Sequence, residues 1–146
     1  MKEGYPEDFE LRKIQKWNTS DVINLIDFIE SIWWTPDWGF RKTWGKDHIH
    51  KKRHVINLEL HTGGWSGNED VINALLKNTM FKIMWYSQWN RGGHYRFEID
   101  PLVIGYKLVS EFCKEHNKSR QYIWKYREKY EWIEISKRIK LIRIKS

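Results

Sequence analysis

Two glycine-rich segments hold the residue types best suited to ligand chemistry. The first segment contributes Thr62, Gly63, Gly64, Trp65, Ser66 and Asn68, the second contributes Arg91, His94 and Tyr95 around Gly92 and Gly93, and Trp85 lies between them. Paired glycines reach positive φ and let backbone amides approach a ligand, while Arg, His and aromatic rings supply charge and stacking surface. These residues therefore predict an anion or ligand site, although they do not name a reaction.

The elements around the first glycine pair fit an anion site. Residues 55–62 place Ile56, Leu58 and Leu60 on one face, which predicts a half-buried strand. Residues 66–69 match the Ser-x-x-Glu capping box that begins a helix. Free amides at such a strand-to-helix turn can hold a phosphate, but neither the P-loop nor the dinucleotide fingerprint occurs. An ordinary turn and helix cap explains these residues equally well.

The second glycine pair predicts a β-hairpin. Apolar and polar residues alternate over 81–89 and again over 94–99, on either side of the glycines. His94, Arg96 and Glu98 then share one face of the second strand. If a helix connects neighbouring strands of one sheet, the two glycine pairs form one pocket.

The six histidines suggest two further chemistries, metal binding and acid–base catalysis. His48 and His50 would share one face of a strand, but the basic residues 51–53 repel a cation. We therefore expect no metal site and no cofactor. His61 and His94 can be imagined as the acid and base of a hydrolase, because imidazole titrates near neutrality. No catalytic triad or nucleophile elbow accompanies them, so we assign no catalytic residue and expect a non-enzymatic protein.

The remaining elements predict an α+β fold. Residues 7–17 read as a short helix, a second helix starts after residues 18–21 with Ser20 as its cap, and residues 39–44 read as a strand. We expect N-terminal helices, then a small mixed β-sheet with a crossing helix and a β-hairpin. These elements form a tryptophan-rich domain over residues 1–104.

The amino-acid composition limits the class of protein and its expected location. Its 146 residues are 40% hydrophobic and 31% charged, as in a globular protein of one domain with a small module. No apolar run approaches the length of a membrane span, and the N-terminus lacks the apolar core of a secretion signal. The single Cys113 cannot form an internal disulfide. We expect a cytoplasmic protein without a membrane partner, and the oligomeric state stays open.

Residues 109–126 follow the pattern of a helix-turn-helix. Cys113 stands where the helices would cross, Asn117 suits a left-handed turn residue, and Ser119 can cap the second helix. Lys118 departs from the pattern, since such motifs usually bury an aliphatic residue there. A C-terminal helix and hairpin that complete one domain would explain the same residues.

The C-terminal residues also carry the excess charge. The net charge of +7 lies within residues 114–146, which hold eleven basic and four acidic residues. Residues 132–144 read as two short strands around a basic turn, so residues 105–146 predict a winged-helix-like module. The expected nucleic-acid contacts are Arg120, Gln121, Trp124 and Lys125 from the second helix, and Lys137, Arg138 and Lys140 from the turn.

Two resemblances accompany these motifs. The string 62–69, with Trp85 and the segment 91–97, resembles a family of small uncharacterised phage and prophage proteins. The segment 119–123 resembles the helix-turn-helix modules of phage regulators. The first resemblance implies an infected or lysogenic bacterial host and no particular activity, and the second implies nucleic-acid binding.

These observations lead to one expected function and two alternatives. We expect a phage-type nucleic-acid-binding or host-modulating protein that binds DNA through its basic C-terminal segment. Alternatively, the glycine turns bind a nucleotide or nucleotide-like signal, which the protein sequesters or hydrolyses. A third possibility is an inhibitor that binds a host nucleic-acid enzyme through aromatic and basic surfaces.

Overall fold

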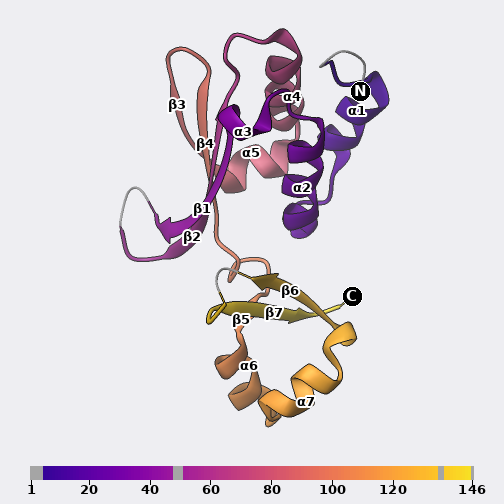
Figure 1. Ribbon diagram of the computed structural model, residues 1–146, viewed down its shortest axis with the longest axis vertical. Helices are drawn as coiled ribbons and strands as arrows, with labels where there is room; N and C mark the ends of the chain where they lie inside the picture. Colours follow the sequence, from indigo (N-terminus) through magenta and orange to yellow (C-terminus); the bar gives the residue numbers. More distant parts are fainter. Residues whose placement is uncertain (1–4, 48–50, 135–136, 146) are drawn as a thin grey trace. The chain divides into compact units, whose positions relative to one another are not determined.

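The computed structural model describes residues 5–47, 51–134 and 137–145 (Figure 1). The chain divides into two compact units, Met1–Ile99 and Asp100–Ser146, where the sequence placed the boundary between residues 104 and 105. Each unit combines helices with an antiparallel sheet, so the predicted α+β class is confirmed. None of the described helices is long and apolar enough to cross a membrane.

The first unit begins with helices. They are α1 (Asp8–Lys16), the 3₁₀ turn η1 (Thr19–Asp21), α2 (Val22–Ile32) and the short α3 (Pro36–Gly39). Asn18, rather than the predicted Ser20, caps the turn before α2, because its Oδ1 accepts the Ser20 N–H at 3.0 Å. Ser20 cannot begin the helix since it lies inside η1. The apolar stripe of α2 is buried, including Leu25 and Ile29.

The sheet of the first unit has four strands. They are β1 (Phe40–Lys46), β2 (His54–His61), β3 (Tyr86–Asn90) and β4 (His94–Ile99), in the order β1-β2-β4-β3. The described pairings are all antiparallel, so the sheet is not mixed as predicted. The difference arises because β4 lies between β2 and β3, which keeps those two parallel strands apart.

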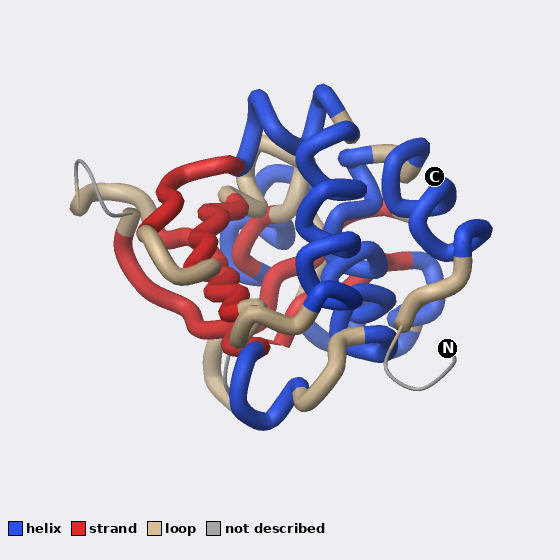
Figure 2. The backbone as a smooth tube through the Cα atoms, turned by 90° about the horizontal axis from the view of Figure 1, so that it is seen from above, coloured by secondary structure: helices blue, strands red, loops and turns tan. Residues whose placement is uncertain are grey.

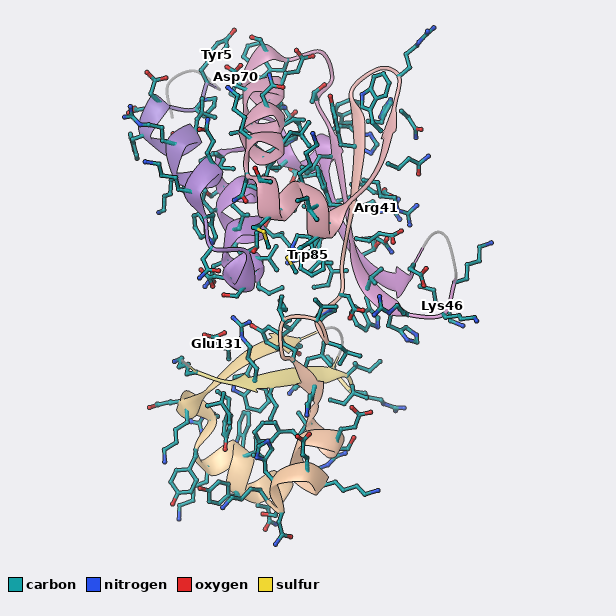
Figure 3. The ribbon with its side chains drawn as sticks, turned by 180° about the vertical axis from the view of Figure 1, so that it is seen from behind. Tyr5, Arg41, Lys46, Asp70, Trp85 and Glu131 are labelled. Carbon is teal, nitrogen blue, oxygen red and sulfur yellow. The ribbon has the colours of Figure 1, made fainter. Side chains whose placement is uncertain are left out.

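The two faces of this sheet differ in polarity. Leu58, Leu60 and Phe97 are fully buried on the face that the helices cover, including α4 (Ser66–Lys77) and α5 (Thr79–Trp85) (Figures 1 and 2). Most of the paired residues on the opposite face are polar. From β2 and β4 they are Asn57, Glu59, His61, His94, Arg96 and Glu98, and Arg41 of β1 lies on this side as well (Figure 3).

Helix α5 replaces part of the predicted hairpin strand 81–89. Asn78 starts the helix, because its Oδ1 accepts the Phe81 N–H at 3.2 Å. Phe81 and Trp85 are four residues apart, so both fall on the buried face of the helix, whereas Ile83 is 72% exposed. Over so short a run, alternating apolar residues fit both a strand and a helix. The helix forms here, and it buries Phe81 and Trp85 on one face.

The second unit pairs two helices with a small sheet. Its elements are β5 (Lys107–Leu108), α6 (Val109–His116), α7 (Arg120–Lys125), the 3₁₀ turn η2 (Arg127–Lys129), β6 (Tyr130–Glu134) and β7 (Lys140–Ile144). The strand order is β5-β7-β6. Asn117 takes the left-handed conformation, with φ 54° and ψ 47°, and Ser119 accepts the Tyr122 N–H at 3.0 Å. Both residues therefore act at the turn as the sequence predicted.

The core of the second unit lies between its helices and one face of its sheet. It is built from Phe112, Ile123, Tyr130 and Ile142, with Cys113 and Tyr126 packed against them. Glu131 lies on the opposite face of the sheet, where its carboxylate accepts Arg143 Nε–H at 2.6 Å (Figure 3). The α7 helix is thus held by one apolar face, while much of its remaining surface is exposed.

Candidate functional site

The two glycine turns of the first unit meet at the ends of neighbouring strands. His61 and His94 are paired across β2 and β4, and the Thr62 N–H donates to the Gly93 carbonyl at 3.0 Å. Gly63 and Gly93 have φ of 62° and 79°, a region that favours glycine. The antiparallel pairing of β2 with β4 therefore brings the two sequence motifs together.

A small open groove lies beside this junction. Its volume is about 130 Å³. The lining residues are Glu59, His61, Gln88, Asn90, His94, Tyr95 and Arg96. The rings of His61 and His94 lie edge to face, with centroids 4.5 Å apart, and their Nδ1 atoms are in contact. Of the predicted ligand residues, His94 and Tyr95 belong to this groove.

Burial and neighbouring charges shift the pKa of His61 in opposite directions. Burial and the neighbouring His94 lower the pKa of His61 from its ordinary value, and Glu59 partly opposes that shift. The Arg96 guanidinium is directed toward Asn57. It donates to Asn57 Oδ1 from Nη2 at 3.0 Å and from Nε at 3.3 Å. Its Nε also lies 3.8 Å from the Glu98 carboxylate. His61 is therefore neutral more readily than an ordinary surface histidine would be.

Three of the predicted ligand residues are buried within the first unit. Thr62 is 2% exposed, at the junction of the glycine turns. Asn68 is equally buried, and its carboxamide bonds both the N–H and the carbonyl of Trp34, at 2.9 and 3.1 Å. Trp85 lies in the interior on α5, where its indole N–H has no partner among the described residues (Figure 3).

Trp65 and Ser66 lie in an aromatic cluster rather than in the histidine groove. The Trp65 ring stacks on Trp34 at 5.4 Å and contacts Tyr5 at 5.0 Å, and Ser66 Oγ lies 3.4 Å from Tyr5 Oη. Trp65 occupies the N-cap of α4, and the described structure has no side-chain cap there. The predicted capping box is therefore wrong, because Ser66 is already inside the helix.

The remaining predicted residues of the glycine turns are exposed. Gly64 lies open at its turn, and Arg91 is exposed at the tip of the β3–β4 hairpin. Gly63 is exposed as well and lies beside Trp38, since a Cβ added there would come within 2.8 Å of that ring. Trp38 is itself 65% exposed. Sequence reasoning missed Trp38, which the turn of α3 brings beside the glycines.

A larger groove lies in the second unit. Its volume is about 340 Å³, and five of the seven predicted nucleic-acid contacts line it: Arg120, Trp124, Lys137, Arg138 and Lys140. Apolar residues complete its wall, among them Ile123 and Trp132. Gln121 and Lys125 are exposed on α7 and do not line the groove. The fold thus brings α7 and the β6–β7 hairpin together around basic side chains.

Aromatic rings and cations lie next to one another in this groove and along the α7–η2 segment beside it. Trp124 is 60% exposed, with the Arg127 guanidinium 4.8 Å and the Lys140 ammonium 5.9 Å from its ring. Lys125 and Lys129 lie 5.5 and 4.8 Å from the Tyr126 ring. Sequence reasoning missed Arg127, although its place three residues after Trp124 on consecutive helical turns puts the two side by side.

Metal-ligand clusters of the usual size do not occur in the described part of the chain. No three His, Cys, Asp or Glu side chains converge there in a way that would hold a metal ion. His48 and His50, which the sequence raised for metal binding, lie outside the described residues.

Comparisons with known proteins give no further assignment. No protein-family model matches the chain, and searches of curated proteins and of solved structures find no match.

Proposed function

We propose that the second unit binds nucleic acid, with DNA as the expected ligand, in the manner of a winged helix. The observation that carries this proposal is the groove in which Arg120 and Trp124 of α7 face Lys137, Arg138 and Lys140 of the hairpin. Its element order of strand, two helices and hairpin, with β5 paired to β7, is compatible with a winged helix.

The chemistry of the groove suits a polyanion with stacked bases. Lysine contributes long-range attraction to phosphates, while arginine can also donate two parallel hydrogen bonds to a guanine edge. The exposed indole of Trp124 offers a face for base stacking. Because residues 114–146 carry the full +7 charge, electrostatic attraction is concentrated in this unit.

The test is a binding titration with the full chain. Fluorescence anisotropy of a labelled DNA duplex at several salt concentrations should show affinity that falls steeply as salt rises. Arg120→Ala should weaken binding, whereas Lys77→Ala, at an exposed position of α4, should not. Undiminished binding by Arg120→Ala together with Lys140→Ala would contradict the proposal.

A second candidate function belongs to the first unit. The meeting of both glycine turns beside the histidine groove favours a small anionic ligand such as a nucleotide. A nucleotide that binds there should raise the melting temperature of the protein, and His94→Ala should remove that shift. The absence of any shift across a broad nucleotide panel would reject this candidate. In either function the protein would act in the cytoplasm of a phage-infected or lysogenic bacterium.

A further inference from the structure

We propose that the groove between α7 and the β6–β7 hairpin holds one unpaired base of a DNA strand, while the cations around the groove hold the neighbouring phosphates. This inference rests on the nucleic-acid binding proposed above, and it names the form of DNA that the groove selects. DNA with an unpaired base should bind more tightly than a fully paired duplex of the same sequence.

The groove is lined by apolar side chains as well as by cations. The apolar lining residues are Leu108, Val109, Ile123, Trp124, Trp132 and Ile139. Ile123 is 1% exposed and belongs to the core of the second unit, so part of the lining is continuous with that core. Phosphates alone would need only the cations. The volume of about 340 Å³ lies within the range of roughly 300–1,000 Å³ that is usual for small-ligand sites. The apolar lining therefore fits an uncharged, planar group such as a nucleobase.

Two tryptophans give the groove an aromatic surface whose surroundings are already ordered. The Trp132 Nε1–H donates to the Arg127 carbonyl at 2.9 Å, and the Arg127 Nη1–H donates to the Trp124 carbonyl at 3.1 Å. Trp124 itself remains 60% exposed, so it keeps a surface on which a base can stack. Because these contacts exist before a ligand binds, less entropy is lost on binding.

Cations lie on both elements that form the groove. Arg120 belongs to α7, Lys137 and Arg138 precede β7, and Lys140 is the first residue of β7. Glu134 is paired with Lys140 across β6 and β7, but no carboxylate is among the described residues that line the groove. A DNA strand has a phosphate on either side of each base. A base in the groove would therefore bring both of its phosphates close to basic side chains.

A fully paired duplex does not offer a base in the form that this groove fits. Paired bases expose only their edges in the major and minor grooves, and neighbouring base pairs cover their faces. Taking a base out of the stack costs free energy, and the cost is least for a base that is already unpaired. The groove should therefore select DNA in which one base is free to leave the stack.

The test compares three DNA probes of one flanking sequence in anisotropy titrations with the full chain. The first is a fully paired duplex, the second carries one extra unpaired nucleotide in one strand, and the third carries an abasic nucleotide at that position. Stacking on an aromatic side chain is worth about 5- to 150-fold in affinity for each base, so the second probe should bind at least about fivefold more tightly than the first. The abasic probe should lose this gain, because it has the extra backbone without the base.

Two variants test whether this groove holds the base. Trp124→Ala removes the exposed indole, and Ser110→Trp places a bulky side chain at an exposed position that lines the groove. Each should abolish the difference between the unpaired-base probe and the paired duplex. Trp38→Ala removes an indole of similar exposure, 65% against 60%, from the first unit and should retain the full difference.

Three results would overturn this inference and leave the proposed nucleic-acid binding intact. They are equal affinities of the wild-type protein for the paired and unpaired-base probes, an equal gain with the abasic probe, and an unchanged preference in both Trp124→Ala and Ser110→Trp. Failure of all three probes to bind would reject the nucleic-acid binding itself, and this inference with it. Circular dichroism establishes whether the variants are folded. If they are not, the wild-type comparison with the abasic probe decides the matter.

Discussion

The backbone N–H of Thr62 donates a hydrogen bond to the carbonyl oxygen of Gly93, with the two atoms 3.0 Å apart. This bond joins the turn after β2 to the hairpin turn before β4. The approach is so close that a Cβ on Gly93 would lie 2.1 Å from Thr62 Oγ1. Gly93 is therefore needed for packing against the first turn, as well as for its own positive φ.

Gly93→Ala should destabilise the protein more than Gly64→Ala does. Both glycines have positive φ, 79° and 75°, and left-handed alanine costs about 1–2 kcal/mol. At Gly64 the added Cβ meets no described atom within 4 Å, so that backbone cost stands alone. At Gly93 the clash with Thr62 adds at least about 1 kcal/mol. Urea denaturation followed by circular dichroism measures both losses, and equal losses would refute the packing role of Gly93.

Asn68→Asp should destabilise the first unit by about 1–3 kcal/mol. The carboxamide of Asn68 accepts the Trp34 N–H and donates to the Trp34 carbonyl, and a carboxylate cannot make the second bond. Asn73→Asp makes the same chemical change at an exposed position of α4 and is the matched control. If Asn68 served only to bind a ligand, the free energy of unfolding would change equally little in both variants.

The sequence predicted local elements better than it predicted which side chains share a site. The left-handed Asn117 and the Ser119 cap depend on neighbouring backbone alone, and both were predicted. The role of Asn68 was missed because its partner Trp34 lies 34 residues away. Helix α5 was missed because Phe81 and Trp85 fit both an alternating and a helical pattern.

The same difference between local patterns and long-range contacts applies to the two grooves. Arg120 and Lys140 could be assigned to one surface because the helix-turn-helix and hairpin patterns are local, and the structure places both at one groove. For the glycine pairs, the sequence allowed a shared pocket but could not supply the β2–β4 register. That register pairs His61 with His94, and it depends on long-range burial of residues such as Leu60.

Tyr130→Phe should reduce the loss of stability of the protein at alkaline pH. Burial raises the pKa of the Tyr130 phenol above its ordinary value of 10.0, with smaller contributions from Tyr122 and Cys113. The unfolded chain therefore loses this proton at lower pH than the folded protein does. Consequently the stability that Tyr130 contributes is present below about pH 10 and is lost as the pH rises above it.

Urea denaturation between about pH 9 and pH 11 measures this effect, since the free energy of unfolding should fall less steeply in the variant. Near neutral pH the free energy of unfolding should differ little between the wild type and Tyr130→Phe. The variant keeps the aromatic ring that packs edge to face on Phe112, with centroids 5.4 Å apart. Tyr126→Phe removes a phenol at the edge of the same core and leaves Tyr130 in place, so it is the control. Parallel curves for wild type and Tyr130→Phe would show that Tyr130 makes no such contribution.

Trp124→Ala and Lys140→Ala should weaken DNA binding in two different ways. Lys140 is expected to neutralise one phosphate, so its loss should lower the slope of log affinity against log salt by about 0.9 for a duplex. Trp124 is expected to stack on a base, so its loss should cost about 1–3 kcal/mol of binding energy with little change in slope. Trp38→Ala removes a similarly exposed indole, 65% against 60%, from the first unit and should change neither quantity. Anisotropy titrations at four salt concentrations separate the two effects, and equal slopes for Lys140→Ala and wild type would exclude a phosphate contact at Lys140.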